Sequence, residues 1–439
     1  MKSAYERVCI LGLGESGKSA YKLLTEDGIE AWGYDDCKNC CDIPMIEDVH
    51  DITKFDLVVV SPGFDFSHEI ITIAREHDVE IISELELGYR YSLCDLIAIS
   101  GTNGKTSTTK MVDTMLRYSG LSVRTGGNIG VPFTSFCKDM TITDVGILEV
   151  SSFQLEHTQN FHPHVAIMLN ITPDHIDRHG SFDNYVLAKS KLFQNMQDAD
   201  YVIANYDDEN VRNCLSSSRA NIFWLSLNTK QKTGVFRDKD RYIYAEYGRF
   251  RPIANCIETI KITNEYNVMA IYALAGILNI PFYTALRAIK HLDTGRYNMN
   301  VCGELEGVRF YNDSKATNTS SVLNDIGYLG ENCALILGGR SKGENYTSFI
   351  EKLVDHTLFL VGENSQELQD IALACDIPSQ RYDSLKSATE SAYIYCREKG
   401  VKNVLFAPAS ASFDSYLNYV DRGDDFDKIV EDICSRNSR

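Results

Sequence analysis

The sequence has no long hydrophobic run, no excess of positive charge and no low-complexity stretch. Apolar runs such as Leu57–Val60 and Leu96–Ile99 last only a few residues, whereas a helix that crosses a bilayer needs about 20. Asp and Glu number 61 against 43 Lys and Arg, so the formal net charge is −18. This charge argues against a general affinity for nucleic acid or for an anionic membrane. Any anionic substrate must therefore be bound in local pockets.

Targeting signals and disulfides are not expected either. The apolar stretch at 8–14 is too short for the core and cleavage site of a signal peptide. The 13 cysteines are odd in number and spread over the whole chain, which favours free thiols in a reducing compartment. We therefore expect a soluble, cytoplasmic and monomeric protein.

The alternation of patterns along the chain indicates its fold class. A chain of 439 residues suggests two to four domains. Short β-branched runs alternate with helical patterns, which predicts an α/β fold with mostly parallel sheets. Since no Ser/Gly-rich linker marks a boundary, we place the boundaries by topology. The predicted domains are residues 1–93, 94–295 and 296–439, of which the first and last are Rossmann-like and the central one resembles a P-loop ATPase.

A first glycine turn follows the predicted strand at 8–11. Residues Gly12–Gly17 read G-x-G-x-x-G, and Asp35 and Asp36 end the next strand, about where a dinucleotide-binding fold keeps its ribose-binding acid. The turn suits a dehydrogenase, another nucleotide phosphate or sugar at the helix N-terminus, or a tight turn without a ligand. The local sequence leaves these three interpretations open.

A second glycine turn is more specific. Residues Ser100–Ser107 read S-G-T-N-G-K-T-S between a predicted strand and the predicted helix Thr106–Tyr118. The glycines let backbone N–H groups face a phosphate, the lysine supplies a point charge, and the threonine that follows it can reach Mg²⁺. The loop departs from the standard phosphate loop, because Ile99 stands where a glycine is usual, five positions before Gly104. We predict that this loop binds a nucleoside triphosphate through Gly101, Thr102, Asn103, Gly104, Lys105, Thr106 and Ser107.

Polar side chains also follow two later strands. Glu149 lies at the end of the predicted strand 145–150, where a carboxylate ligand of Mg²⁺ belongs in such a sheet; a strand-end acid facing water is the alternative. Residues Asn170–His179 read N-I-T-P-D-H-I-D-R-H and crowd five ionisable side chains at one strand exit. The crowding favours a site rather than an isolated structural histidine.

Lys189 lies on the apolar face of a predicted helix over 185–196. The other residues of that face follow at spacings of three and four; they are Tyr185, Ala188, Leu192, Phe193 and Met196. A charged amine on such a face is costly to desolvate. Three outcomes remain open, namely extension to the surface, pairing with an acid, or chemical conversion of the amine.

These motifs resemble those of the Mur ligase family. The similarity runs through GTNGKTS at 101–107, LEVSSFQLEH at 148–157, NITPDHIDRH at 170–179 and the helix around Lys189. In that family an ATP-dependent central domain joins an amino acid to a UDP-linked cell-wall precursor. The resemblance implies ATP and two Mg²⁺ ions. It also implies that Lys189 is carbamylated and becomes a carboxylate-like metal ligand.

The resemblance assigns further residues to metal and ATP. Glu149 with Thr106 would place the first Mg²⁺, and His175 would help to place the second. Asn264 and Asn267 match the family's adenine-side motif, although a threonine precedes the first asparagine where a histidine is usual. The remaining ATP contacts would come from Arg296 on the phosphates, Lys315 on the γ-phosphate and Asp313 on the ribose.

Polar residues of the last block cluster at three strand exits, 312–318, 338–343 and 407–414. Ligands of open α/β sheets bind at these carboxyl ends. Lys, Ser and Thr there suit a dicarboxylic amino acid, because each carboxylate needs charge-assisted donors; three ordinary polar turns are the alternative. The motifs NDSKATN and ASASFDSY resemble the Mur ligases that attach D-glutamate to UDP-N-acetylmuramoyl-L-alanine. By that resemblance, D-glutamate would be held by Thr317, Lys342, Ser412 and Tyr419.

The resemblance also selects one interpretation of the first glycine turn. In this family the N-terminal domain binds the UDP of the precursor, so nicotinamide is not expected. The implied contacts are Ser16, Asp35, Asp36, Ser61, Pro62 and Gly63. The alanyl carboxylate would form an acyl phosphate with ATP near His175 and Asn128, and the D-glutamate amine would then attack it, as a step of peptidoglycan precursor synthesis. The catalytic candidates are Lys105, His175, Lys189, Lys315 and Asn128.

Three other interpretations compete with this one. Folylpolyglutamate synthase also adds glutamate, but it should open directly with the phosphate loop, and here about 95 residues precede that loop. A nucleotide-dependent switch protein needs no second metal site, which Glu149, His175 and Lys189 together suggest. A zinc module at Cys37, Cys40 and Cys41 lacks a nearby second Cys/His pair to complete four ligands.

Overall fold

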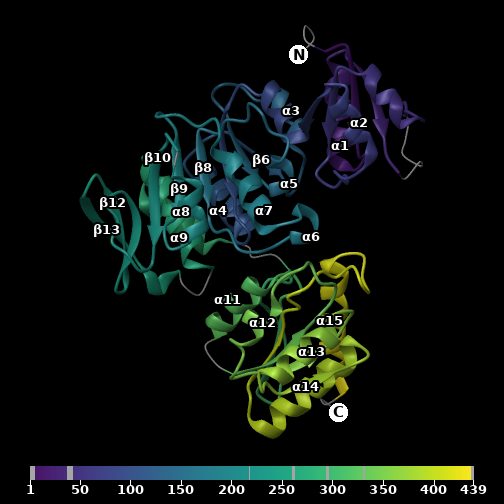
Figure 1. The fold of residues 1–439 in the computed structure, drawn as a ribbon. Coiled ribbons are helices and arrows are strands. Elements are labelled where there is room, and N and C mark those ends of the chain that lie inside the picture. Colours follow the sequence, from purple (N-terminus) through teal and green to yellow (C-terminus); the bar gives the residue numbers. More distant parts are fainter. Residues whose placement is uncertain are drawn as a thin grey trace. The chain divides into compact units, whose positions relative to one another are not determined.

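The structure is a computed structural model that describes residues 5–36, 43–216, 218–259, 263–292, 296–329 and 332–436. It contains three β-sheets of four, nine and six strands, most of them parallel, with helices between many of the successive parallel strands (Figure 1). The predicted α/β class with mostly parallel sheets is therefore confirmed. No helix among the described residues is long and apolar enough to cross a membrane. All ten described cysteines carry free thiols.

The first sheet is parallel throughout and has the order β2-β1-β3-β4. Its strands are β1 (Arg7–Leu11), β2 (Glu30–Tyr34), β3 (Leu57–Val60) and β4 (Glu80–Ser83). Its helices are α1 (Glu15–Glu26), α2 (Glu69–Glu76) and α3 (Glu84–Tyr91). The chain passes from β1 to β2 on one side and then to β3 on the other. The carboxyl ends of β1 and β3 thus form a topological switch point, where open α/β sheets bind their ligands.

Helix α3 connects the first sheet to the second. Glu86 on this helix is fully buried, and its carboxylate accepts hydrogen bonds from the backbone N–H groups of Asn160 and Phe161 at 3.0 and 2.9 Å. Arg90, one turn later, donates to the same carboxylate at 2.9 Å. A buried carboxylate needs such donors and a counter-charge. The two backbone contacts fix α3 against the loop that precedes β8 (Val165–Met168) of the second sheet.

The second sheet has the order β13-β12-β11-β10-β9-β8-β5-β7-β6. Its parallel part contains β5 (Asp95–Ser100), β6 (Val123–Gly127), β7 (Val145–Glu149), β8 (Val165–Met168), β9 (Tyr201–Asn205), β10 (Asn221–Ser226) and β11 (Gly234–Asp238). The antiparallel strands β12 (Arg241–Glu246) and β13 (Arg249–Asn255) extend it. The sequence analysis did not predict this extension.

Helices cover the second sheet and supply most of its core. Helix α9 (Glu265–Ile277) is buried on all sides from Asn267 to Ala275, and α4 (Lys105–Tyr118) packs beside it. The other helices of this stretch are α5 (Ser152–Leu155), α6 (Ile176–His179), α7 (Phe182–Ser190), α8 (Glu209–Cys214) and α10 (Phe282–Lys290). A helix that is apolar on all faces belongs in a core.

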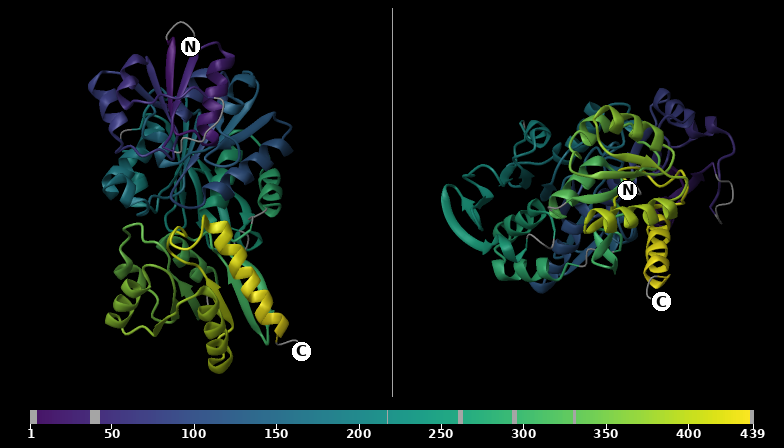
Figure 2. Two further views of the ribbon diagram at one scale, coloured as in Figure 1. Left: turned by 90° about the vertical axis from the view of Figure 1, so that its right-hand side faces the viewer. Right: turned by 90° about the horizontal axis from the view of Figure 1, so that it is seen from below.

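The third sheet has the order β14-β15-β19-β16-β17-β18. Its strands are β14 (Asn300–Leu305), β15 (Val308–Asn312), β16 (Cys333–Leu337), β17 (Thr357–Leu360), β18 (Ser379–Arg381) and β19 (Asn403–Phe406). Only the edge pair β14–β15 is antiparallel. The helices are α11 (Thr319–Leu329), α12 (Tyr346–Ile350), α13 (Ser365–Ala374), α14 (Leu385–Lys399) and α15 (Tyr419–Arg436). Helix α15 packs along β14, as Figure 2 shows.

The chain divides into two compact units. The first comprises Met1–Ile171 and Asp183–Asp293 and holds the first two sheets; the second comprises Thr172–Phe182 and Thr294–Arg439 and holds the third. The segment 172–182 thus belongs with the C-terminal sheet although it follows β8. The predicted boundary at 93 remains a prediction, and the one at 295 lies outside the described residues.

The helix predicted over 185–196 differs from the observed one. Helix α7 ends at Ser190, and a 3₁₀ turn over Lys191–Phe193 continues the chain. The predicted apolar face is nevertheless correct, because all its members are buried. Burial follows from the spacing of apolar side chains, whereas the last turns of a helix often tighten into 3₁₀ geometry.

Candidate active site

The second glycine turn connects β5 to α4 and requires its glycines. Gly101 and Gly104 have φ angles of +152° and +88°, and a side chain at Gly104 would lie 2.5 Å from Asn267 Oδ1. Positive φ is costly for residues with a Cβ atom. Thr106 and Ser107 stand in the first turn of α4, whose N–H groups and dipole favour an anion. The turn has the geometry of a phosphate loop.

Lys105 is held inside this loop. Its ammonium donates to the carbonyl oxygens of Gly101 and Thr102 at 2.9 and 2.8 Å. Carbonyl oxygens carry only partial charge, so a phosphate would be a stronger partner for this ammonium. The side chain predicted to meet the ATP phosphates is therefore already positioned on the loop.

Asn170 at the exit of β8 fixes the loop from one side. Its side chain accepts from Asn103 N at 2.8 Å and donates to Asn103 O at 3.0 Å, and its carbonyl accepts from Thr102 N at 2.9 Å. Strand β5 lies between β7 and β8, so residues at these exits flank the loop. The sequence analysis assigned no role to Asn170; its place at the start of N-I-T-P-D-H was the available signal.

Glu149 at the exit of β7 lies on the other side of β5. It is 1% exposed; its Oε1 accepts from Asn128 Nδ2 at 2.9 Å, and its carbonyl accepts from Asn128 N at 2.8 Å. No hydrogen-bond donor among the described residues reaches its buried Oε2. Burying a carboxylate oxygen costs free energy unless a cation or a hydrogen-bond donor contacts it. The residues present therefore fit an Mg²⁺ ion, which prefers carboxylate oxygens.

Lys189 on α7 reaches the same loop. It is 1% exposed, its ammonium donates to Gly101 O at 2.9 Å, and it lies 4.9 Å from the centroid of the Tyr185 ring. The Tyr185 hydroxyl is 3.0 Å from Thr102 Oγ1. The lysine therefore does not extend to the surface, and Lys105 and Lys189 share one carbonyl acceptor. This placement agrees with a role of Lys189 near the loop and does not test its carbamylation.

The two asparagines predicted on the adenine side differ in their surroundings. Asn267 is 4% exposed, contacts the loop at Gly104 and donates to Thr263 Oγ1 at 3.0 Å. Asn264 instead accepts from Tyr266 N at 2.9 Å and caps the N-terminus of α9. Asparagine is a preferred N-cap residue, so this contact has a structural reason. The structure thus brings only Asn267 to the phosphate loop.

The first glycine turn is built around Asp35 and Ser61. Leu13 N donates to Asp35 Oδ2 at 2.6 Å, and Ser61 Oγ donates to Gly12 O at 2.6 Å. Gly12 has a φ of +82°. Residues 61–63 follow β3 directly, so the predicted UDP contacts Ser16, Asp35, Ser61, Pro62 and Gly63 gather at the switch point of the first sheet.

An aromatic group beside this turn was not predicted. The ring of His68 lies 5.3 Å from that of Tyr34 and 5.5 Å from that of Phe64. Asp36 is largely exposed next to them, with Oδ1 3.8 Å from His68 Nε2. The three rings come from separate segments, so no motif signals them. The ring planes of Tyr34 and Phe64 are tilted by 58° and 54° from that of His68, so the three rings form a packed aromatic cluster at the edge of the predicted UDP site.

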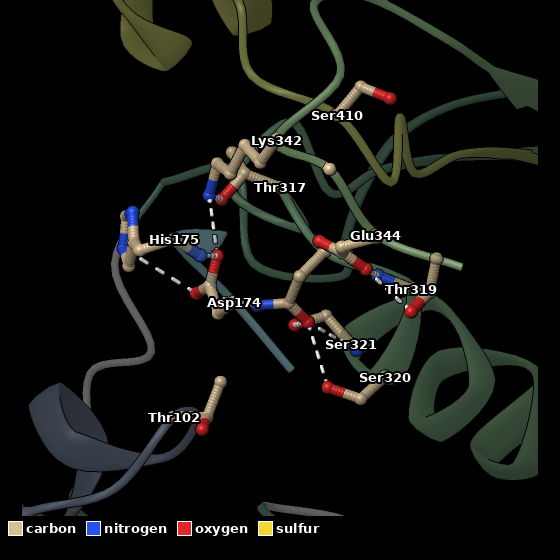
Figure 3. A network of polar contacts seen from close by, with 12 residues as sticks. Thr102, Asp174, His175, Thr317, Thr319, Ser320, Ser321, Lys342, Glu344 and Ser410 are labelled. Carbon is tan, nitrogen blue, oxygen red and sulfur yellow. Dashed lines mark hydrogen bonds and ion pairs between the residues drawn. The ribbon is translucent and has the colours of Figure 1, made fainter. Parts of the chain in front are cut away.

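In the second unit, the segment after β8 meets the third sheet. Lys342 Nζ lies 3.1 Å from Asp174 Oδ1 and donates to Thr317 Oγ1 at 3.2 Å (Figure 3). His175 follows Asp174 with an unusual φ of +54°, and its Nε2 is 3.6 Å from Asp174 Oδ2. Two residues predicted to hold D-glutamate, Thr317 and Lys342, are therefore neighbours, and Asp174 joins them to His175.

The loops with Ser314 and Ser412 are tied together by Arg422. This guanidinium is 3% exposed and donates to Ser314 Oγ at 3.1 Å, Ser314 O at 3.0 Å and Ser410 O at 3.1 Å. Burial lowers the pKa of Arg422 to about 10. Ser412 is buried nearby in sequence, and Tyr419 begins α15. No role was predicted for Arg422.

The remaining predicted ATP contacts also lie in this unit. Asp313 is 4% exposed, and burial raises its pKa to about 6 beside the buried carboxyl of Asp325. Lys315 N donates to Tyr297 O at 3.1 Å. Arg296 is exposed and pairs with Asp424 at 2.8 Å. These contacts position the three predicted residues within the C-terminal fold without testing their contact with ATP.

The predicted metal ligands fall into both units. Thr106, Glu149 and Lys189 belong to the first unit, and His175 belongs to the second. In the described part of the chain, no group of three or more His, Cys, Asp or Glu side chains forms a metal site. The predicted set relies instead on one acid, one histidine, a threonine and a modified lysine. The cysteines considered for zinc, at 37, 40 and 41, lie outside the described residues.

Comparison with solved structures supports the fold. The pseudomurein peptide ligase type C from Methanothermus fervidus matches with a TM-score of 0.61 at 16% identity, covering 98% of this chain and 100% of its own. The UDP-N-acetylmuramate–alanine ligase from Thermotoga maritima matches with a TM-score of 0.56 at 16% identity, covering 97% and 99%. At this identity the likeness concerns the fold alone.

Comparison of sequences is more specific. Residues 99–277 match the Mur ligase middle domain. Two proteins named UDP-N-acetylmuramoylalanine–D-glutamate ligase match over nearly their whole length. The one from Caldanaerobacter subterraneus subsp. tengcongensis is 32% identical over 99% of this chain and 100% of its own, and the one from Natranaerobius thermophilus is 33% identical over 96% and 97%. With these matches and the phosphate loop described above, the chain belongs to the Mur ligase family.

Proposed function

We propose that this protein is an ATP-dependent ligase that joins D-glutamate to UDP-N-acetylmuramoyl-L-alanine in cytoplasmic peptidoglycan precursor synthesis. The observation that carries the proposal is the arrangement at the second glycine turn, where Lys105 and Lys189 meet on Gly101 O. That arrangement suits phosphoryl transfer. The substrates are inferred from the full-length relatives that bear the ligase's name.

The reaction would proceed in two steps. An oxygen of the alanyl carboxylate attacks the γ-phosphorus of ATP, so that an acyl phosphate forms and ADP leaves. The D-glutamate amine then attacks the acyl carbon, loses a proton and expels phosphate. Lys105 would exchange its carbonyl partners for phosphate oxygens and stabilise the charge of the transferring group. Lys315, Asp313 and Arg296 keep their predicted roles toward ATP in this proposal.

Mg²⁺ would neutralise charge on the phosphate oxygens. Two ions are proposed: Thr106 and Glu149 would hold the first, and His175 would help to hold the second. A carbamylated Lys189 would be a ligand of one of the two. Of these, Glu149 has the clearest reason, since its Oε2 is buried without a donor among the described residues. Asn128 would orient this carboxylate through Oε1, where it donates at 2.9 Å. A carboxylate oriented in this way is preorganised for a cation.

Two further groups of residues would bind the two substrates that the enzyme joins. Ser16, Asp35, Asp36 and the turn at 61–63 are proposed to bind the UDP part at the switch point of the first sheet. Thr317, Lys342, Ser412 and Tyr419 are proposed to bind D-glutamate. The contact between Lys342 and Thr317, 3.2 Å long, supports this second assignment because both groups can donate to one carboxylate.

An ADP-release assay tests the function. The purified protein is supplied with UDP-N-acetylmuramoyl-L-alanine and ATP, and D-glutamate, L-glutamate, L-lysine and diaminopimelate are compared as second substrates. We expect turnover with D-glutamate and less than about one hundredth of it with the others, because a site built on charge-assisted donors rejects ligands that leave them unpaired. Equal or greater turnover with any other amino acid would reassign the substrate.

A further inference from the structure

Asp174 and Lys342 form an ion pair across 168 residues of sequence (Figure 3). The ammonium and the carboxylate oxygen are 3.1 Å apart, and the two side chains are only 12% and 8% exposed. Two charges removed from water to this degree need each other, because neither is well solvated alone. Since Lys342 is proposed to meet a substrate carboxylate, its present partner occupies the place that the substrate would take.

The Asp174 carboxylate is held in a defined position. Its Oδ1 also accepts from His175 N at 3.0 Å. Its Oδ2 lies 3.6 Å from His175 Nε2 and 3.5 Å from Asn318 Nδ2. These contacts come from its own segment and from the loop that contains Thr317. The carboxylate would therefore remain in place if Lys342 were drawn toward another anion.

A second carboxyl lies on the loop of Lys342. Glu344 accepts from Thr319 N and Oγ1 at 2.9 and 2.6 Å, and burial raises its pKa to about 7. One ammonium and two carboxyl groups thus lie close together around Lys342. A site with this balance of charge is poorly matched to a simple dicarboxylate, which carries only negative charge. It is better matched to a ligand that also carries a positive group.

We propose that Asp174 binds the ammonium group of the incoming amino acid while Lys342 and Thr317 bind one of its carboxylates. The amino acid would break the ion pair between Asp174 and Lys342 and form two new ones, its ammonium with Asp174 and its carboxylate with Lys342. Neither protein charge would then be buried without a partner. The inference rests on the proposed function, because it assigns a group to the D-glutamate pocket. It would also place the amine beside His175, which follows Asp174 in the chain.

The test separates recognition of the amine from recognition of the carboxylates. D-Glutamate and glutarate, which lacks the amine, are titrated into the enzyme by calorimetry with UDP-N-acetylmuramoyl-L-alanine and a non-hydrolysable ATP analogue present. We expect the unaltered protein to bind D-glutamate about ten- to a hundredfold more tightly than glutarate, the range of one hydrogen bond to a charged group. The substitution Asp174→Asn should weaken the binding of D-glutamate by that factor. The binding of glutarate should stay the same or become tighter.

Matched variants complete the design. Lys342→Met should weaken both ligands alike, and Asp177→Asn, which changes an exposed acid on the same segment, should alter neither. Equal weakening of both ligands by Asp174→Asn, or no change in either, would overturn the proposal. Retained glutarate binding shows that the variant is folded, and Asp174→Glu, which keeps the charge, should preserve part of the preference. If the unaltered protein binds D-glutamate no better than L-lysine and releases no ADP with it, the proposed function itself fails.

Discussion

The two glycine turns of the first unit share a plan and differ in the charges around them. Each connects a central parallel strand to a helix, β1 to α1 and β5 to α4, and each uses a glycine with positive φ. In the first turn, the carboxylate of Asp35 accepts a hydrogen bond from the backbone N–H of Leu13. In the second, the ammonium groups of Lys105 and Lys189 donate to a loop carbonyl.

This difference shows that glycine spacing alone does not choose a ligand. The glycines allow the backbone to turn tightly. The side chains contributed by neighbouring strands and helices determine whether the loop binds a negative or a polar group. A loop approached by an acid suits hydroxyl groups such as those of a ribose, whereas one approached by two ammonium groups suits phosphates. The comparison predicts effects that differ between the two turns.

The largest effect is expected for Lys105→Met. Removing this positioned cation should lower the rate of ADP release on the order of a thousandfold. Lys18→Met is the matched control, because Lys18 occupies the first helical turns after the first glycine loop and is exposed; its rate should stay within about twofold. Comparable losses in both variants would mean that the two turns handle charge in the same way.

Lys189→Ala should lower the rate of ADP release about a hundredfold. If the lysine acts as a carbamylated metal ligand, added acetate or formate should restore part of the loss by supplying a carboxylate. Lys191→Ala serves as the control, since this neighbouring lysine donates instead to the Glu156 carbonyl. Carbamylation is excluded if acetate and formate restore no activity to Lys189→Ala and if bicarbonate depletion does not change the activity of the unaltered protein.

Asp35→Asn should act on substrate binding more than on the rate. We expect KM for the UDP precursor to rise roughly tenfold and kcat to change by less than about threefold, because the interaction would be equal in ground and transition states. Asp36→Asn should have a smaller effect, since Asp36 is largely exposed. A fall in kcat with constant KM would move Asp35 from binding into the chemical steps.

The smallest effects concern the glycines themselves. Gly12→Ala should destabilise the protein by about 1–2 kcal/mol, because its φ is +82° and a Cβ atom would lie 3.1 Å from Ser61 Cβ. Gly14→Ala should cost less than about 0.5 kcal/mol, since its φ is −67° and nothing lies within 4 Å of the added carbon. The midpoint of the first thermal unfolding transition measures both. Equal shifts would contradict the assigned conformations.

The parallel strands and the positions of their exits were readable from the sequence. Short β-branched runs bounded by turns predicted β1 at 8–11 and β7 at 145–150, each within one residue of the observed ends. The buried face around Lys189 followed from spacing. The strands β12 and β13 were missed because their sequences, RYIYAE and RFRPIAN, mix charged residues and a proline with apolar ones and form no β-branched run. The N-cap role of Asn264 competes with the ligand role that its motif suggested.

The sequence by itself determined the fold class, the phosphate loop and the family, because these depend on residues close together in the chain. Only the tertiary structure decided which distant groups meet. Asn170 with Asn103, Glu149 with Asn128, and Asp174 with Lys342 are pairings across strand exits, and each depends on the order of strands in a sheet or on which unit a loop joins. The physical reason is that an ion pair or hydrogen bond acts over a few ångströms, whatever the separation of its partners along the chain.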